Sequence, residues 1–277
     1  MTLGVLAALL GVGLIVGFVS GLIGIGGGVL IVPFLYFFYG HPAWSGLFVD
    51  PELEATIAHA TSLAVILPTG LAAAAAHHRA GLVAWRAALP IAAVAAAAAV
   101  AGANIAVLLP AEALKLMFGL LLIGSGVNLT RSQEGRAREQ LRLTWPVVVG
   151  TGMAVGLLSA MLGVGGGILA IPLLVYIVGV DIRRVAATSI ALVALTAASG
   201  TITYAVAGWG DPGRPPGSIG YIHVVAALPI LLASLLTVRA GALANQRLHT
   251  RHLRLLFAVV FFLLGVRLII ENAGALV

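Results

Sequence analysis

Cysteine is absent from this sequence, and charged residues make up only 9% of it. Without cysteine there can be no disulfide bond, no thiolate metal site and no cysteine-based redox relay. An ordinary globular domain carries about 25% charged residues. This chain of 277 residues is instead 61% hydrophobic, with a mean hydropathy of +1.13. The composition therefore predicts an integral membrane protein.

Several motifs that would indicate enzymes or cofactor proteins are also missing. The sequence has no cluster of metal-ligand residues, and no Asp or Glu lies in the middle of an apolar run. Its glycine-rich segments are not followed by Lys-Ser or Lys-Thr, as a phosphate-binding P-loop requires. The basic residues behind the net charge of +6 lie in short loops, where they set membrane orientation. We therefore expect no enzymatic activity, no cofactor, no metal and no nucleic-acid partner.

Long apolar runs indicate membrane-spanning α-helices. A helix needs about 20 residues to cross the bilayer, and the alternating segments of a β-barrel are absent. Residues 28–39 form a shorter apolar run, and residues 40–54 read as a polar loop. The most charged stretch, 131–144, reads as a basic cytoplasmic linker between a first membrane repeat at 1–130 and a second at 145–277. The longest runs of the first repeat cover residues 3–23, 56–76, 87–109 and 112–130.

The second half of the chain repeats the first. Pro33 and Pro172 lie 139 residues apart, and Pro90 and Pro229 keep the same spacing. Thr61-Ser62 matches Thr188-Ser189 at a spacing of 127, because the 40–54 loop lengthens the first half; the stretch 209–220 then restores the register. Internal repeats of this kind are typical of secondary transporters.

The distribution of positive charge predicts how the repeats are oriented. If each glycine-broken segment enters and returns, 12 of the 15 basic residues fall on one side of the membrane. By the positive-inside rule that side is cytoplasmic, which places both termini outside and inverts the two halves. We therefore predict an all-α protein of the bacterial inner membrane with two inverted-topology repeats. Each repeat has a glycine-broken or re-entrant helical segment, or a full helix followed by a half helix, and then three transmembrane helices.

Two glycine-rich segments are the candidate site. They read Gly24-Ile25-Gly26-Gly27-Gly28 and Gly163-Val164-Gly165-Gly166-Gly167, and each should end one helix and begin another because glycine holds a helix poorly. The first turn of the new helix leaves N–H groups unpaired, and these groups, the helix dipole and a nest of glycine amides all favour an anion. Alternatively, the glycines only permit close helix crossing.

Hydroxyl groups near the two breaks extend this prediction, because they can donate to an oxyanion. Each of them could instead bond to the backbone of its own or a neighbouring helix. A histidine beside the first Thr-Ser pair is a candidate for proton coupling, with a structural role as the alternative. The candidate substrate-binding residues are Ser20, Gly24, Gly26, Gly27, Gly28, Thr61, Ser62, Ser159, Gly163, Gly165, Gly166, Gly167, Thr188 and Ser189, and the proton-coupling candidate is His59.

The two copies Gly17-Phe-Val-Ser-Gly-Leu-Ile-Gly-Ile-Gly-Gly-Gly-Val-Leu-Ile-Val-Pro33 and Gly156-Leu-Leu-Ser-Ala-Met-Leu-Gly-Val-Gly-Gly-Gly-Ile-Leu-Ala-Ile-Pro172 resemble the TauE/SafE family of membrane permeases, also called sulfite exporters. The Ala-Thr-Ser stretches at 60–62 and 187–189 agree with the family. The resemblance covers essentially the whole chain. It implies transport of small sulfur-containing anions such as sulfite, sulfonates or sulfoacetate.

We therefore expect a secondary transporter that moves such anions through the bilayer by alternating access, with H⁺ as a candidate coupling ion. An anion channel on the same scaffold, or a transporter of another small organic anion, are the alternatives.

Overall fold

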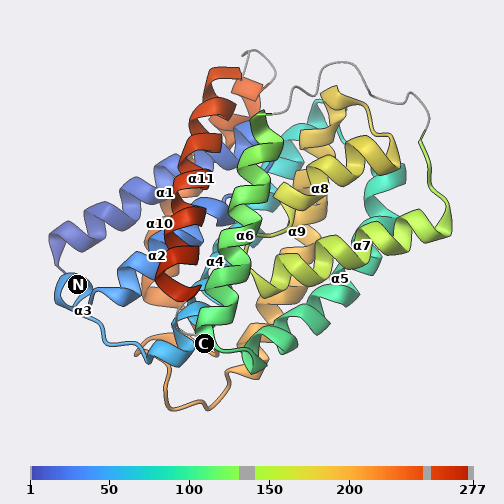
Figure 1. Cartoon of the computed structure of the whole chain (residues 1–277). Helices are drawn as coiled ribbons and strands as arrows, with labels where there is room; N and C mark the ends of the chain where they lie inside the picture. Colours follow the sequence, from blue (N-terminus) through green and yellow to red (C-terminus); the bar gives the residue numbers. More distant parts are fainter. Residues whose placement is uncertain (1, 131–140, 246–250, 274–277) are drawn as a thin grey trace.

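The computed structural model describes residues 2–130, 141–245 and 251–273, and it is almost entirely α-helical (Figure 1). Most of the expected linker, residues 131–140, lies outside the described residues. The helices are α1 (Leu3–Ile23), α2 (Gly28–Gly40), α3 (Pro42–Ser45), α4 (Pro51–Arg79), α5 (Trp85–Leu108), α6 (Ala111–Thr130), α7 (Trp145–Met161), α8 (Gly167–Leu173), the π-helical turn η1 (Leu174–Val178), α9 (Ile182–Ala207), α10 (Val224–Asn245) and α11 (Arg251–Ala273).

Among the described residues, five helices are long and apolar enough to cross a membrane, namely α1, α4, α5, α9 and α10. The chain is thus a multi-pass membrane protein. Helices α2 and α7 and the continuous segment 167–178 are apolar but shorter. The most apolar windows of α4 and α9 are 72% and 67% buried, against 39% for α5 and α10. Helices α4 and α9 are therefore the central pair.

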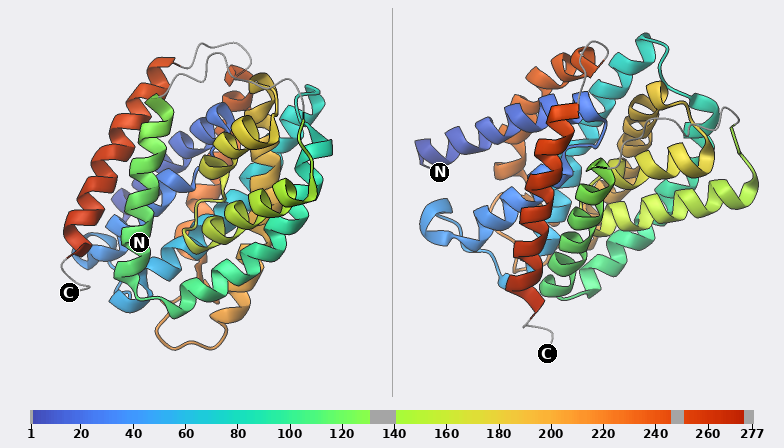
Figure 2. Two further views of the ribbon diagram at one scale, coloured as in Figure 1. Left: turned by 45° about the vertical axis from the view of Figure 1, so that its right-hand side comes forward. Right: turned by 45° about the horizontal axis from the view of Figure 1, so that its top comes forward.

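Three further pairs of helices pack around this centre. Helix α1 lies against α10, α7 lies against α5, and α6 lies beside α11 in both ribbon figures (Figure 1, Figure 2). Small residues make these crossings close. A Cβ on Gly17 or Gly21 would collide with the backbone of α10, and one on Gly156 would collide with Ala95 of α5. Helix association in membranes relies on such close backbone approach.

Two local features differ from the sequence expectation. The 40–54 loop is shorter than expected because α4 already begins at Pro51, which places Glu52 and Glu54 in its first turn. The Asp50 carboxylate accepts the Glu52 N–H at 3.1 Å, and proline suits the first position of a helix. The helix therefore starts earlier than hydrophobicity alone indicates.

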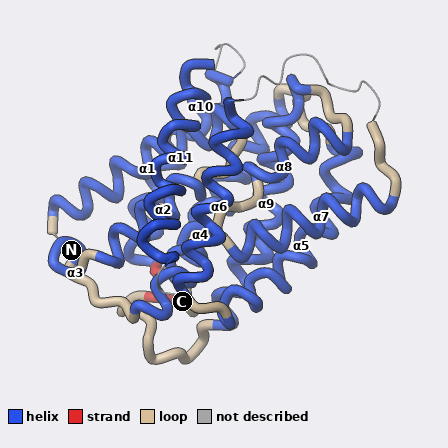
Figure 3. Tube along the Cα trace, viewed as in Figure 1, coloured by secondary structure: helices blue, strands red, loops and turns tan. Residues whose placement is uncertain are grey.

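The second difference is a small β-hairpin that closes the 209–220 insertion. Strands β1 (Ser218–Ile219) and β2 (Ile222–His223) are antiparallel, with Ser218 opposite His223; Figure 3 draws them in red. The Tyr221 hydroxyl donates to Asp211 Oδ2 at 2.8 Å. Burial, together with this carboxylate, raises the pKa of Tyr221 to about 12, so the hydroxyl keeps its proton and holds the hairpin to the loop.

Candidate functional site

Positive backbone φ angles interrupt the helices at both glycine segments. Gly24, Gly26 and Gly27 have φ of 76°, 90° and 76°. In the second segment, Gly163, Gly165 and Gly166 have φ of 65°, 76° and 85°. A side chain in this left-handed region costs about 1–2 kcal/mol per residue, and glycine avoids that cost. Helices α1 and α7 therefore end at Ile23 and Met161, and α2 and α8 begin at Gly28 and Gly167.

The two breaks touch each other in the middle of the molecule. A Cβ on Gly28 would lie 2.7 Å from Val164 Cα, and a Cβ on Gly167 would lie 2.7 Å from Ile25 Cα. Val193 of the central helix α9 contacts both breaks, since its Cγ1 would lie 2.9 Å from a Cβ on either Gly26 or Gly165. Backbone packs directly on backbone here, which is the close crossing considered from the sequence as the alternative role of the glycines.

The serines of the two Thr-Ser pairs reach across to these breaks. Ser62 Oγ of α4 donates to Gly163 O at 2.7 Å. Ser189 Oγ of α9 lies 3.2 Å from Gly24 O and 3.3 Å from Gly167 O. Each serine thus bonds to the break of the opposite half of the chain. Ser62 and Gly163 are 101 residues apart, and Ser189 and Gly24 are 165 residues apart.

The threonines of the same pairs bond elsewhere. Thr61 Oγ1 accepts the His223 N–H at 3.0 Å, just before α10. Thr188 Oγ1 accepts the Ala84 N–H at 3.1 Å, just before α5, and donates to Arg184 O at 2.7 Å. Each hydroxyl thus accepts a backbone N–H at the start of a helix that packs on its own helix, α10 on α4 and α5 on α9. They remain candidate substrate ligands by sequence position.

Ser20 and Ser159 have a different environment. Each is 1% exposed, and neither Oγ has a hydrogen-bond partner. Each faces the last left-handed glycine of its own break: a Cβ on Gly27 would lie 3.8 Å from Ser20 Oγ, and one on Gly166 would lie 3.2 Å from Ser159 Oγ. Buried hydroxyls are normally paired, because an unpaired polar group costs about 1–3 kcal/mol. These two hydroxyls are unsatisfied donors at the breaks.

Amide groups of the new helices lie beside these serines. The Leu30 and Ile31 N–H groups both donate to Gly27 O, at 3.0 and 3.1 Å, and the Ala170 N–H donates to Gly166 O at 2.8 Å. The N–H groups of the turn before them are the ones for which a helix supplies no acceptor of its own. Buried hydroxyl and amide donors with no charged side chain among them are suited to an oxyanion.

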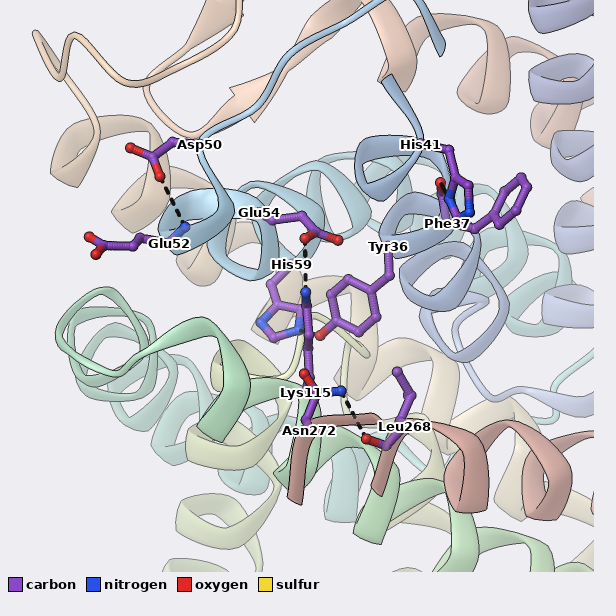
Figure 4. A network of polar contacts seen from close by, with 10 residues as sticks. All are labelled: Tyr36, Phe37, His41, Asp50, Glu52, Glu54, His59, Lys115, Leu268 and Asn272. Atoms are coloured by element: carbon purple, nitrogen blue, oxygen red, sulfur yellow. Dashed lines mark hydrogen bonds and ion pairs between the residues drawn. The ribbon is translucent and has the colours of Figure 1, made fainter. Parts of the chain in front are cut away.

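His59 lies against the second break. Its Cα is 2.5 Å from the position a Cβ on Gly163 would take, so the glycine is needed for this contact. Its Nε2 pairs with the Tyr36 hydroxyl, and its Nδ1 is buried without a partner (Figure 4). The ring also stacks on Phe118 of α6 with a centroid separation of 6.2 Å. The histidine predicted to couple protons is therefore fully buried and within reach of the glycine site.

Sequence reasoning missed a polar cleft of about 210 Å³ between α2, α4, α6 and α11. Lys115 Nζ and Glu54 Oε2 form an ion pair of 2.8 Å in it, with side chains 17% and 12% exposed (Figure 4). Lys115 is the one lysine in the sequence and lies within the apolar run 112–130, which is the signal that could have identified it. Tyr36 had no sequence signal, because its partner His59 is 23 residues away.

The described residues contain no group of three or more His, Asp or Glu side chains that could hold a metal ion. The polar groups gathered at the breaks are hydroxyls, amides and one histidine. This donor set suits the direct binding of a small anion.

The known proteins to which this chain is similar are described as membrane transporters. The model of the sulfite exporter TauE/SafE family matches residues 9–268. A probable membrane transporter protein of Haemophilus influenzae is 30% identical over 94% of this chain and 96% of its own length. Probable membrane transporter proteins of Methanocaldococcus jannaschii and Bacillus subtilis are 27% and 26% identical, over 92% and 94% of this chain and 91% and 96% of their own. No solved structure matches significantly. The chain therefore belongs to the sulfite exporter TauE/SafE family of membrane transporters.

Proposed function

We propose that this protein is a secondary transporter that moves small sulfur-containing anions, such as sulfite, sulfonates or sulfoacetate, by alternating access around the paired glycine breaks. The observation that carries the proposal is the pair of buried, unpartnered hydroxyls of Ser20 and Ser159 beside two touching breaks. The family description supports the sulfur-containing substrate. The anion would accept hydrogen bonds from these hydroxyls and from glycine amides at 26–28 and 165–167, since the Gly24 and Gly163 N–H groups donate to Ser20 O and Ala160 O.

Burial of the site supports alternating access. Every residue at 19–29 and at 159–168 is buried. An anion reaches such a site only if the packing around it opens, and it crosses without a continuous pore if the two sides open in turn. In secondary transporters the substrate sites lie where broken helices of two repeats meet.

Equivalent contacts support an inverted repeat of 1–130 and 145–277. Ser62 bonds to the second break as Ser189 bonds to the first, and Thr61 and Thr188 accept the N–H groups just before α10 and α5. Helix α1 packs on α10 as α7 packs on α5. A two-fold axis in the membrane plane would generate all these pairs together.

The proposed topology places both termini outside the bacterial inner membrane, and the lack of cysteine makes it testable. Four exposed positions serve as single-cysteine reporters: Glu52, Ala80, Arg183 and Pro216. In intact spheroplasts, an impermeant thiol reagent should label cysteines at 52 and 216 and reach those at 80 and 183 only after permeabilisation. Labelling of all four in intact spheroplasts, or of 80 and 183 alone, would exclude this topology.

Flux into proteoliposomes tests the function. Purified wild-type protein should accumulate radiolabelled sulfite or a small sulfonate, with saturation and with acceleration by unlabelled anion inside the vesicles. Acceleration by internal substrate is a property of carriers, so its absence alongside rapid flux would indicate a channel. Uptake of small carboxylates alone would indicate another organic anion, and no uptake of any of these anions would refute the proposal.

The Ser20→Ala/Ser159→Ala variant tests the site itself. Because neither hydroxyl has a partner in the protein, their removal should leave the unfolding temperature unchanged or slightly higher. Losing two hydrogen bonds to an anion should raise the half-saturating concentration at least tenfold, at about 1 kcal/mol or more per bond. An unchanged half-saturating concentration would remove the serines from the site.

The Gly27→Val/Gly166→Val variant fills the space beside the same hydroxyls. The added atoms would meet Val16 and Val155, at 2.7 and 2.8 Å from the new Cβ positions, and would block the serines. Transport should be abolished, and continued transport by this variant would contradict the site assignment.

A further inference from the structure

The cleft between α2, α4, α6 and α11 holds two ion pairs. Lys115 pairs with Glu54 at 2.8 Å, and Arg267 pairs with Glu271 at 2.7 Å. The first pair is largely buried, while the side chains of the second are 61% and 50% exposed. Tyr36 and His41 also line the cleft. Before any ligand enters, the four charges balance, so the cleft is electrically neutral.

The Lys115–Glu54 pair is open to exchange of partners. Breaking a buried pair by removing one partner is costly, because the other charge is left uncompensated. An incoming oxyanion avoids that cost, since it gives Lys115 a new anionic partner at the moment Glu54 is displaced. The displaced carboxylate then has no cation beside it, and a proton bound to it would compensate its charge. One anion and one proton together leave the cleft neutral again.

We propose that Lys115 and Glu54 form the outer coupling site of the transporter, where a small oxyanion replaces Glu54 at the Lys115 ammonium while Glu54 takes a proton from external water. The protein therefore carries the anion together with H⁺. This inference rests on the proposed function and adds its coupling ion and first binding site. In this step an O–H bond of a hydronium ion breaks, an O–H bond to the Glu54 carboxylate forms, and a water molecule is released.

A row of polar groups leads from this cleft to the glycine breaks. Lys115 Nζ lies 5.6 Å from the centroid of the Tyr36 ring, the Tyr36 hydroxyl pairs with His59 Nε2, and His59 packs on Gly163 (Figure 4). An anion released from Lys115 thus meets the second break after one aromatic layer. The cleft lies at the end of the molecule that the proposed topology places outside.

Other titratable and charged groups face Glu54 from the elements packed around it. From α2 these are Tyr36 and Tyr39, with His41 just beyond that helix. A Cβ added at Gly40 would lie 3.6 Å from Glu54 Oε1. From α4 itself there is His59, and from α6 there is Lys115. From α11 there are Arg267 and Glu271 across the cleft. Among these described groups, Lys115 is the cation in direct contact with Glu54.

Proteoliposomes containing a trapped pH dye and given external methanesulfonate provide the test. This sulfonate stays an anion at every working pH, so any proton that enters with it is carried by the protein. Wild-type protein should acidify the lumen as methanesulfonate enters, and lowering the external pH from 7.5 to 6 should speed uptake. If wild-type protein moves methanesulfonate without moving protons, the coupling is wrong while the proposed function stands. If it moves no anion at all, the proposed function fails first.

The variant Glu54→Gln keeps a hydrogen-bond acceptor for Lys115 and removes the titrating group. It should lose lumen acidification and the response to external pH, yet keep exchange of labelled for unlabelled methanesulfonate, because exchange needs no net proton movement. Glu52→Gln is the matched control, since Glu52 lies on the same helix, is exposed and does not line the cleft. It should behave as wild type. Unchanged proton coupling in Glu54→Gln would overturn the proposal.

The variant Lys115→Gln tests the anion partner. It should raise the half-saturating methanesulfonate concentration at least tenfold, and Lys115→Arg should restore most of the affinity. If a single change prevents folding, the double variant Lys115→Gln/Glu54→Gln removes both charges and leaves a neutral cleft. Its proton-to-anion ratio should be near zero, and a wild-type ratio in this double variant would equally refute the coupling site.

Discussion

The two glycine breaks have a similar backbone conformation, but different side chains lie against them. Gly163 packs on His59, whereas the equivalent Gly24 packs on Ala186. Tyr36, the partner of His59, has Val175 at the equivalent position, 139 residues later, in the π-helical turn η1. One break thus has a histidine and a tyrosine beside it that continue into the cleft, and the other has alanine and valine at the two equivalent positions. The two breaks therefore combine a similar backbone conformation with different chemistry.

Filling the contact between the breaks should have the largest effect. Gly28→Val and Gly167→Val each push a side chain into the backbone of the opposite break. Overpacking of this kind costs about 1–3 kcal/mol even where neighbours can move, and here the neighbours are backbone atoms. Each variant should lose transport and most of its folded yield. Gly124→Val is the control, because a Cβ there meets no atom within 4 Å. Equal thermal unfolding temperatures for all three would show that the breaks do not touch.

A double-mutant cycle on the polar side of the comparison should have a smaller effect. Tyr36→Phe leaves His59 without its partner, and His59→Leu leaves the Tyr36 hydroxyl unpaired. Each single change should cost about 1–3 kcal/mol of unfolding free energy, because a buried polar group becomes unsatisfied. The double variant should cost less than the sum, since it makes this half apolar like the half with Val175 and Ala186. Strictly additive costs in denaturant titrations would mean that the two side chains do not interact.

The serines that cross between the halves should behave alike. Ser62→Ala removes the bond to Gly163 O, and Ser189→Ala removes those to Gly24 O and Gly167 O. Each loss should destabilise the folded protein by about 1 kcal/mol, which is the usual contribution of a neutral hydrogen bond. Differential scanning of the two variants in the same detergent measures it. A stability loss confined to one serine would break the equivalence of the two halves.

The N-caps of α4 and α9 should show the smallest difference between the two halves. The Asp50 carboxylate accepts the Glu52 N–H at the start of α4, and that of Asp181 accepts the Arg183 N–H at the start of α9. Replacing either aspartate by alanine should cost about 0.5–2 kcal/mol, as for other N-caps. Matching shifts in unfolding temperature are expected for Asp50→Ala and Asp181→Ala. A tenfold change in flux from either variant would reveal a role beyond capping.

Local chemistry made much of the fold predictable. Apolar runs of sufficient length indicated the membrane-spanning helices, and positive φ at Gly24 and Gly163 is what glycine-dense sequence favours. The start of α4 was placed too late because hydropathy does not register a cap, although Asp50-Pro51 carries that signal. The hairpin at 218–223 was missed because its strands have two residues each, too few to show an alternating pattern.

The sequence by itself determined the membrane class, the duplication and the positions of both helix breaks, because these follow from hydropathy and from the conformational freedom of glycine within a few neighbouring residues. Only the tertiary structure decided that the breaks touch, that Ser62 and Ser189 bond across the halves while Ser20 and Ser159 stay unpaired, and that Lys115 meets Glu54. Those contacts join residues far apart in the chain. They depend on how whole helices pack, which no local pattern encodes.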